Sequence, residues 1–219
     1  MSSNLALNPG LNSFKDFFID SNGVFRNVVY YVDKTRFIEK AYNHNAIVTL
    51  FTKPRRFGKS MFLSMLKTFF EPNIKNPNDL TMHEKIFSQL DIYKDKEFCQ
   101  KYMGKFPVLY ITFASYSSEI SYENIINNLC GAISSCAMEY SFLLQSDKLS
   151  DRDKDNLSIL CDLFKSKDPL EDKITFITMS LKLLCNIIYQ HYEKKIVVLI
   201  DEYDVPLSRA AQTDYYNEI

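Results

Sequence analysis

The sequence predicts an α/β protein with a mostly parallel central sheet covered by helices. Three short apolar runs, residues 46–51, 108–113 and 195–200, have the length and β-branched content of strands that are buried on both faces. Segments with helical periodicity separate these runs, and strands that alternate with helices usually pair in parallel. We therefore expect a sheet with helices on both faces.

Composition narrows the class of protein. The 219 residues include 26 Lys and Arg against 27 Asp and Glu, a formal net charge of −1, and 46% are hydrophobic. This balance argues against a nucleic-acid coat protein and against disorder. Five cysteines without a C-x-x-C pair and three histidines argue against a zinc site. The chain shows no signal-peptide pattern and no apolar run of membrane-spanning length, so we expect a cytoplasmic protein without membrane partners.

The elements of the first half follow from local signals. Residues 1–29 read as a loop-like N-terminal extension, and residues 30–219 as one core. Residues 30–32 are strand-like, and Asp33 is placed to cap a helix over 34–43. A turn at 43–45 leads into the run 46–51. A helix is predicted over 59–70, because Pro72 disfavours helical backbone at the residue before it.

The second half alternates in the same way. Residues 72–105 look helical and polar, with breaks at Pro72, Pro77 and Gly104, and Pro107 introduces the second strand. Ser121 is placed to cap a helix over 122–140. Residues 146–156 read as a charged loop. From Ile174, apolar residues recur at steps of three and four, which predicts an amphipathic helix packed against the sheet.

The segment after the first predicted strand has a phosphate-binding pattern. Gly58 lets the backbone approach phosphate oxygens, Lys59 would reach the β- and γ-phosphates, and the Ser60 hydroxyl would ligate Mg²⁺. The positive end of the following helix adds to the attraction for an anion. Lys53 stands where the generic G-x-x-x-x-G-K-[ST] pattern has its first glycine. Alone, such a triplet is a weak signal that also fits a helix start with a surface lysine.

A second element strengthens this interpretation. The last apolar strand delivers Asp201 and Glu202 at its carboxyl end, which has the form of a Walker B element. Asp201 would hold the Mg²⁺ shell, and Glu202 would polarise the attacking water as general base. An acidic pair after a strand is often only a solvated turn. Together with the upstream loop it predicts a nucleotide site at the carboxyl end of the strands.

Four blocks of the chain resemble the prokaryote-abundant AAA-ATPase-like family: residues 30–35 with 52–60, residues 95–113, residues 191–206, and Tyr215-Tyr216. The resemblance implies a P-loop NTPase three-layer sandwich and a family variant of the loop. The nucleotide-contacting residues it implies are Tyr31, Asp33, Pro54, Arg55, Arg56, Phe57, Gly58, Lys59, Ser60 and Met61. Family members commonly continue into a sensor strand, a helical lid and a restriction-endonuclease-like domain, so the resemblance implies a core truncated after the Walker B strand.

The expected function is ATP binding with Mg²⁺-dependent hydrolysis. Lys59 and Glu202 are the predicted catalytic residues, and Ser60 and Asp201 are the predicted metal ligands. The alternative is a non-catalytic nucleotide-binding or interaction module, a fragment of a larger ATPase–nuclease protein with a DNA-linked role. Expected partners are ATP and ADP, further copies of the chain, and nucleic acid bound through the absent C-terminal region. Basic residues at 53, 55 and 56 offer a third route, direct association with nucleic acid.

Overall fold

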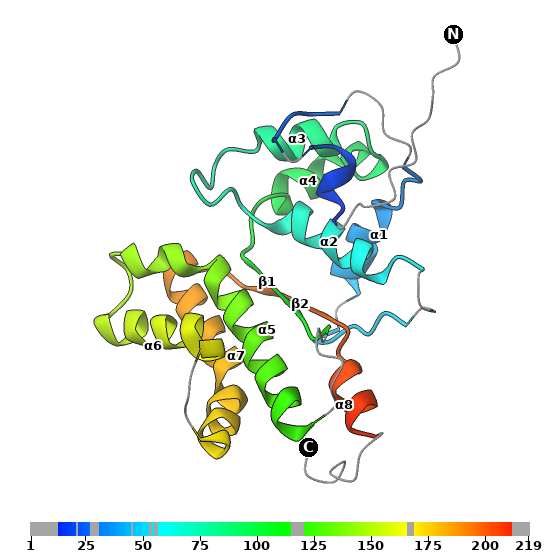
Figure 1. The fold of residues 1–219 in the computed structure, drawn as a ribbon. Coiled ribbons are helices and arrows are strands. Elements are labelled where there is room, and N and C mark those ends of the chain that lie inside the picture. Colours follow the sequence, from blue (N-terminus) through cyan, green and yellow to red (C-terminus); the bar gives the residue numbers. More distant parts are fainter. Residues whose placement is uncertain are drawn as a thin grey trace. The chain divides into compact units, whose positions relative to one another are not determined.

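The computed structural model describes residues 13–20, 22–26, 31–44, 46–52, 54, 57–114, 121–165 and 169–211. The protein is α/β and divides into two compact units, residues 1–106 and residues 107–219, each of which is described by itself (Figure 1). No helix in the described ranges is long and apolar enough to cross a membrane.

The first unit is helical in its described part. Its elements are η1 (Lys15–Phe17), α1 (Arg36–Asn43), α2 (Lys59–Phe70), α3 (Thr81–Phe87), η2 (Asp91–Lys94) and α4 (Lys96–Tyr102). Aromatic rings make up much of its core. The ring centroids of Phe69 and Phe87 lie 5.2 Å apart in an edge-on arrangement, and Phe14 stacks on Phe87 at 5.6 Å. All three side chains are fully buried, and Phe14, which directly precedes η1, is therefore part of this core.

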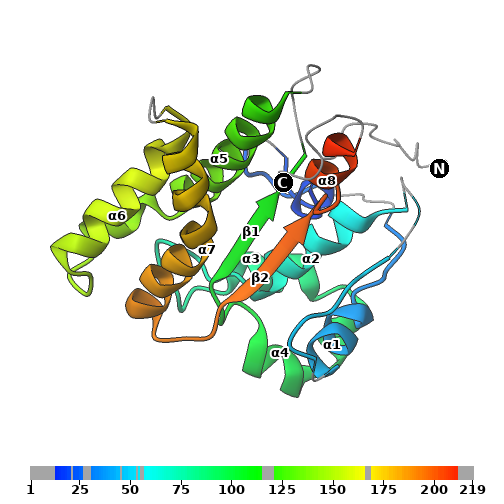
Figure 2. The same ribbon diagram turned by 90° about the horizontal axis from the view of Figure 1, so that it is seen from below.

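The second unit carries the sheet. Its elements are β1 (Val108–Thr112), α5 (Tyr122–Glu139), η3 (Ser141–Gln145), α6 (Asp151–Asp162), η4 (Leu163–Lys165), α7 (Leu170–Tyr192), β2 (Val197–Asp201) and α8 (Val205–Ala210). The two strands are parallel, with Val108 opposite Val197 and Thr112 opposite Asp201 (Figure 2). Leu109 and Ile111 of β1 join a buried apolar core with α5, α6 and α7. This packing confirms an α/β fold, whereas the three-layer P-loop sandwich stays a prediction.

The predicted strand over 46–51 is wrong for the described residues. They form no strand, and Ile47 and Val48 are 104% and 83% exposed. A β-branched apolar run becomes a strand only when a neighbour pairs with its backbone, and no described strand pairs with this run. Tyr31 and Val32, the described part of the predicted strand over 30–32, are also outside any strand.

The predicted charged loop over 146–156 is wrong in its second part, because α6 begins at Asp151. The Ser150 side chain caps this helix by accepting a hydrogen bond from the Asp153 amide at 3.2 Å. Acidic residues in the first turn suit the positive end of a helix, and Leu157 and Leu160 on the inner face are fully buried. The amphipathic helix predicted from Ile174 is confirmed as α7, which begins earlier, directly after Pro169.

Candidate functional site

The phosphate-binding pattern lies at the start of α2. The helix begins at Lys59 and ends at Phe70, as predicted, and Gly58 precedes it with φ +77° and ψ +30°. This left-handed conformation strains residues that carry a Cβ atom. The Gly58 carbonyl accepts the first helical hydrogen bond, from the Phe62 amide at 2.9 Å. Gly58 therefore allows a sharp turn that leads directly into the Lys59-Ser60 pair.

The first turn of α2 has features that suit an anion. It contains no acidic residue, and no side chain caps it at Gly58. The amides of a first helical turn have no intrahelical acceptor and carry partial positive charge. Ser60 is exposed, whereas Lys59 and Met61 are half-buried. The far end of the helix is anchored in the core by Met65, Leu66, Phe69 and Phe70.

The predicted arginine-rich loop before α2 is described only in part. Arg55 and Arg56, with Lys53, lie outside the described residues. Pro54 and Phe57 are exposed, and the Phe57 amide donates to the Pro54 carbonyl at 3.3 Å.

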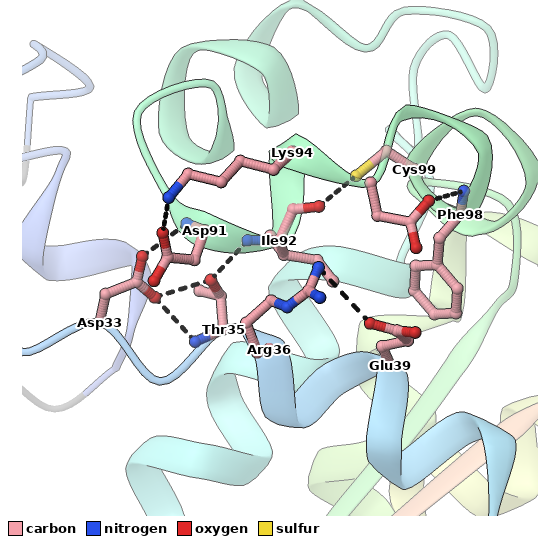
Figure 3. A network of polar contacts seen from close by, with 10 residues as sticks. Asp33, Thr35, Arg36, Glu39, Asp91, Ile92, Lys94, Phe98 and Cys99 are labelled. Carbon is pink, nitrogen blue, oxygen red and sulfur yellow. Dashed lines mark hydrogen bonds and ion pairs between the residues drawn. The ribbon is translucent and has the colours of Figure 1, made fainter.

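Asp33 is engaged in a structural network in the first unit. Its Oδ1 accepts hydrogen bonds from the amide and hydroxyl of Thr35, at 2.8 and 2.7 Å, and its Oδ2 accepts one from the Asp91 amide at 2.6 Å (Figure 3). The helix predicted from residue 34 begins instead at Arg36, with Thr35 in the N-cap position. Asp33 thus links the start of α1 to η2.

Tyr31, the other residue with an implied adenine contact, packs among aromatic rings. Its ring centroid lies 5.4 Å from that of Phe14 and 5.5 Å from that of Phe17. Its hydroxyl donates to the sulfur of Met65 at 3.5 Å, and burial raises the pKa of Tyr31. Adenine contacts by Tyr31 and Asp33 stay predictions.

The acidic pair lies where β2 ends. Asp201 is the last residue of the strand and is 6% exposed, whereas Glu202 is half-buried. Glu202 has φ +52°, in the left-handed region. Such a conformation in a residue with a Cβ atom is uncommon and costs of order 1–3 kcal/mol. The Glu202 amide donates to Asp201 Oδ1 at 3.0 Å, so the first carboxylate supports the strained backbone of the second residue.

Tyr110 on the neighbouring strand was not among the residues predicted from the sequence. Its hydroxyl donates to Asp201 Oδ2 at 3.2 Å. Burial raises the pKa of Tyr110 well above its ordinary value of 10, and the Asp201 carboxylate raises it further. The hydroxyl therefore stays protonated and available as a donor. Only the strand register reveals this pairing, because Tyr110 and Asp201 are 91 residues apart in the sequence.

The side chains predicted to bind the metal offer oxygen atoms, which suit Mg²⁺. Ser60 offers a hydroxyl and Asp201 a carboxylate, and Mg²⁺ prefers oxygen ligands, of which only one or two are usually protein carboxylates. Among the described residues, each Asp201 side-chain oxygen accepts one hydrogen bond, and its second lone pair could accept one from a metal-bound water. Within the described ranges, no cluster of three or more His, Cys, Asp or Glu side chains could hold a metal ion.

The described elements define an α/β protein with a helix-start glycine and an acidic strand end. Residues 19–219 match the model of the family described as predicted AAA-ATPase, and the chain belongs to that family. No curated protein and no solved structure gives a significant match.

Proposed function

We propose that the protein binds ATP and hydrolyses it with Mg²⁺. The observation that carries this proposal is the start of α2, where a left-handed glycine leads into Lys59-Ser60 at an uncapped helix N-terminus. Backbone amides at such an end, with a lysine beside them, favour a phosphate group. Membership of the predicted AAA-ATPase family supports a nucleotide as the source of that phosphate.

Each of the four predicted catalytic and metal-binding residues has a chemical role in this proposal. Lys59 would neutralise charge on the β- and γ-phosphates, and the Ser60 hydroxyl and the Asp201 carboxylate would hold Mg²⁺. A bound Mg²⁺ ion supplies charge neutralisation on the phosphate oxygens. Glu202 would orient the attacking water and accept its proton. Positioned charge is most of what phosphoryl transfer requires from a protein, and these four side chains would supply that charge and the general base.

Nucleotide titration tests the binding step. We expect Lys59→Ala to weaken binding of a fluorescent ATP analogue at least tenfold, as a charge-assisted phosphate contact is lost. Lys75, an exposed lysine of the first unit, provides the matched control: Lys75→Ala should bind like the wild type. Equal affinity of the wild type and Lys59→Ala would contradict the proposed phosphate site.

Phosphate release tests the chemical step. We expect Glu202→Gln to retain ATP with wild-type affinity and to lose steady-state phosphate release, because glutamine cannot accept the proton of the attacking water. A wild-type chain that binds ATP but releases no phosphate at any protein concentration would contradict hydrolysis and would favour a non-catalytic nucleotide-binding module.

A further inference from the structure

The sheet of the second unit places one tyrosine against the acidic pair. Tyr110 lies opposite Leu199 in the parallel register, and Asp201 lies two residues further along β2. Residues two apart on a strand share a face, so Tyr110 and Asp201 project from the same face of the sheet. The Tyr110 hydroxyl spans this diagonal and donates to Asp201 Oδ2 at 3.2 Å.

The contacts continue from Asp201 into the next residue. The second carboxylate oxygen, Oδ1, accepts the Glu202 amide at 3.0 Å, and Glu202 is held at φ +52°. Strained backbone persists only where neighbouring groups over-determine it, and it clusters at functional sites. One oxygen of the Asp201 carboxylate thus accepts the Tyr110 hydroxyl, and the other oxygen accepts the amide of the strained Glu202 backbone.

We propose that Tyr110 is a positioning residue that fixes the Asp201 carboxylate and, through it, the backbone from which the Glu202 side chain projects. The expected effect of this positioning on Mg²⁺ binding and on the attacking water rests on the proposed ATPase function. The contact with Asp201 and its effect on the Glu202 backbone can be tested without nucleotide. Tyr110 itself is assigned no contact with nucleotide or metal.

Two features of the second unit make the hydroxyl testable on its own. Phenylalanine keeps the aromatic ring, so Tyr110→Phe removes only the hydroxyl. Tyr140 is a matched control, because its hydroxyl donates to the Val108 carbonyl on the same strand at 2.7 Å. Tyr140→Phe therefore reports the general cost of losing a tyrosine hydroxyl beside β1.

The first measurement is amide hydrogen exchange at Glu202 in the full chain without nucleotide. We expect Tyr110→Phe to accelerate exchange at this amide about tenfold, the equivalent of one charge-assisted hydrogen bond, and Tyr140→Phe to leave it unchanged. In an Asp201→Ala background, Tyr110→Phe should have no additional effect, since the tyrosine acts through the carboxylate. Unchanged exchange in Tyr110→Phe, or an equal effect in both backgrounds, would overturn the proposal.

The second measurement is the Mg²⁺ dependence of ATP affinity. Mg²⁺ is expected to tighten ATP binding, and the Mg²⁺ concentration that gives half of this effect should be several-fold higher in Tyr110→Phe than in the wild type. The affinity for ATP measured in EDTA should be unchanged. An equal loss with and without Mg²⁺ would overturn a positioning role toward the metal. If the wild type binds no nucleotide, the proposed ATPase function fails, and the exchange measurement still decides whether Tyr110 positions the acidic pair.

Discussion

The carboxylate of Asp33 accepts a hydrogen bond from the backbone amide of Asp91 at 2.6 Å, across 58 positions of sequence. Thr35 reinforces this link, because its fully buried hydroxyl donates to Asp33 and accepts the Ile92 amide at 3.1 Å (Figure 3). Four polar groups therefore satisfy one another where α1 begins and η2 passes: the Asp33 carboxylate, the Thr35 hydroxyl and two backbone amides. Buried polar groups are costly when they lose a partner, so this network is expected to stabilise the first unit.

Thr35→Val is expected to destabilise the first unit. Valine keeps the shape but removes the hydroxyl, which leaves the Ile92 amide without this acceptor. We expect a loss of about 1–3 kcal/mol in the free energy of unfolding, measured by urea denaturation. Thr68→Val is the control, because the half-buried Thr68 hydroxyl only donates to the Ser64 carbonyl of its own helix at 2.8 Å. Equal stability of the two variants would contradict the structural role of Thr35.

The backbone of Glu202 gives a second prediction. Glycine adopts positive φ without strain, so Glu202→Gly should be more stable than Glu202→Ala by about 1 kcal/mol. The exposed Glu171 in the first turn of α7 provides the opposite case. At this position, the Glu171→Gly variant should be less stable than the Glu171→Ala variant by about 1 kcal/mol. Chemical denaturation of all four variants measures both differences. The same sign at both positions would show that Glu202 is not held in the left-handed region.

Sequence reasoning succeeded where the signals were local. Helix α2 runs from Lys59 to Phe70 as predicted, because a glycine before it, a proline after it and apolar spacing between them act within one short segment. The strands at β1 and β2 were also predicted within one or two residues. Pro107 before β1 and the apolar runs of both strands are sufficient to predict these two strands.

Two of the failures and omissions depended on partners that sequence patterns do not reveal, and one on a local signal that resembles a loop. The run 46–51 looks like β1 and β2, but the described residues show it without a pairing strand. The sequence does not reveal the capped start of α6 at Ser150, because the charged first turn of this helix resembles a loop. Tyr110 could be linked to Asp201 only through the register of two strands, and that register follows from tertiary packing.

The left-handed turn at Gly58 predicts a position-specific cost. A Cβ atom there would meet nothing within 4 Å, so the cost of Gly58→Ala comes from the backbone alone. We expect a loss of about 1–2 kcal/mol in the free energy of unfolding. Gly58→Asn should lose less, because asparagine tolerates the left-handed region better. Denaturation midpoints at constant m-value provide the measurement, and an alanine variant as stable as the wild type would contradict this backbone conformation.

His83 predicts a pH dependence of stability. The side chain is fully buried, and burial lowers its pKa below the ordinary value of 6.5, with Lys15 and Lys105 acting in the same direction. A hydrogen bond with the Glu71 carbonyl at 2.9 Å and the charge of Asp79 oppose this shift without cancelling it. The folded protein therefore holds His83 neutral at pH values where the unfolded chain already binds a proton.

The sign of the effect follows from proton linkage. Stability from neutral His83 is fully present above pH 6.5 and is lost as the pH falls from 6.5 toward the lower folded pKa. His83→Gln can still donate to the Glu71 carbonyl but cannot titrate, so the decline of unfolding free energy below pH 6.5 should become shallower. The exposed His44 provides the control, and His44→Gln should retain the wild-type slope. Urea denaturation from pH 7.5 to 5 measures these slopes, and identical slopes in the wild type and His83→Gln would show that His83 does not carry this dependence.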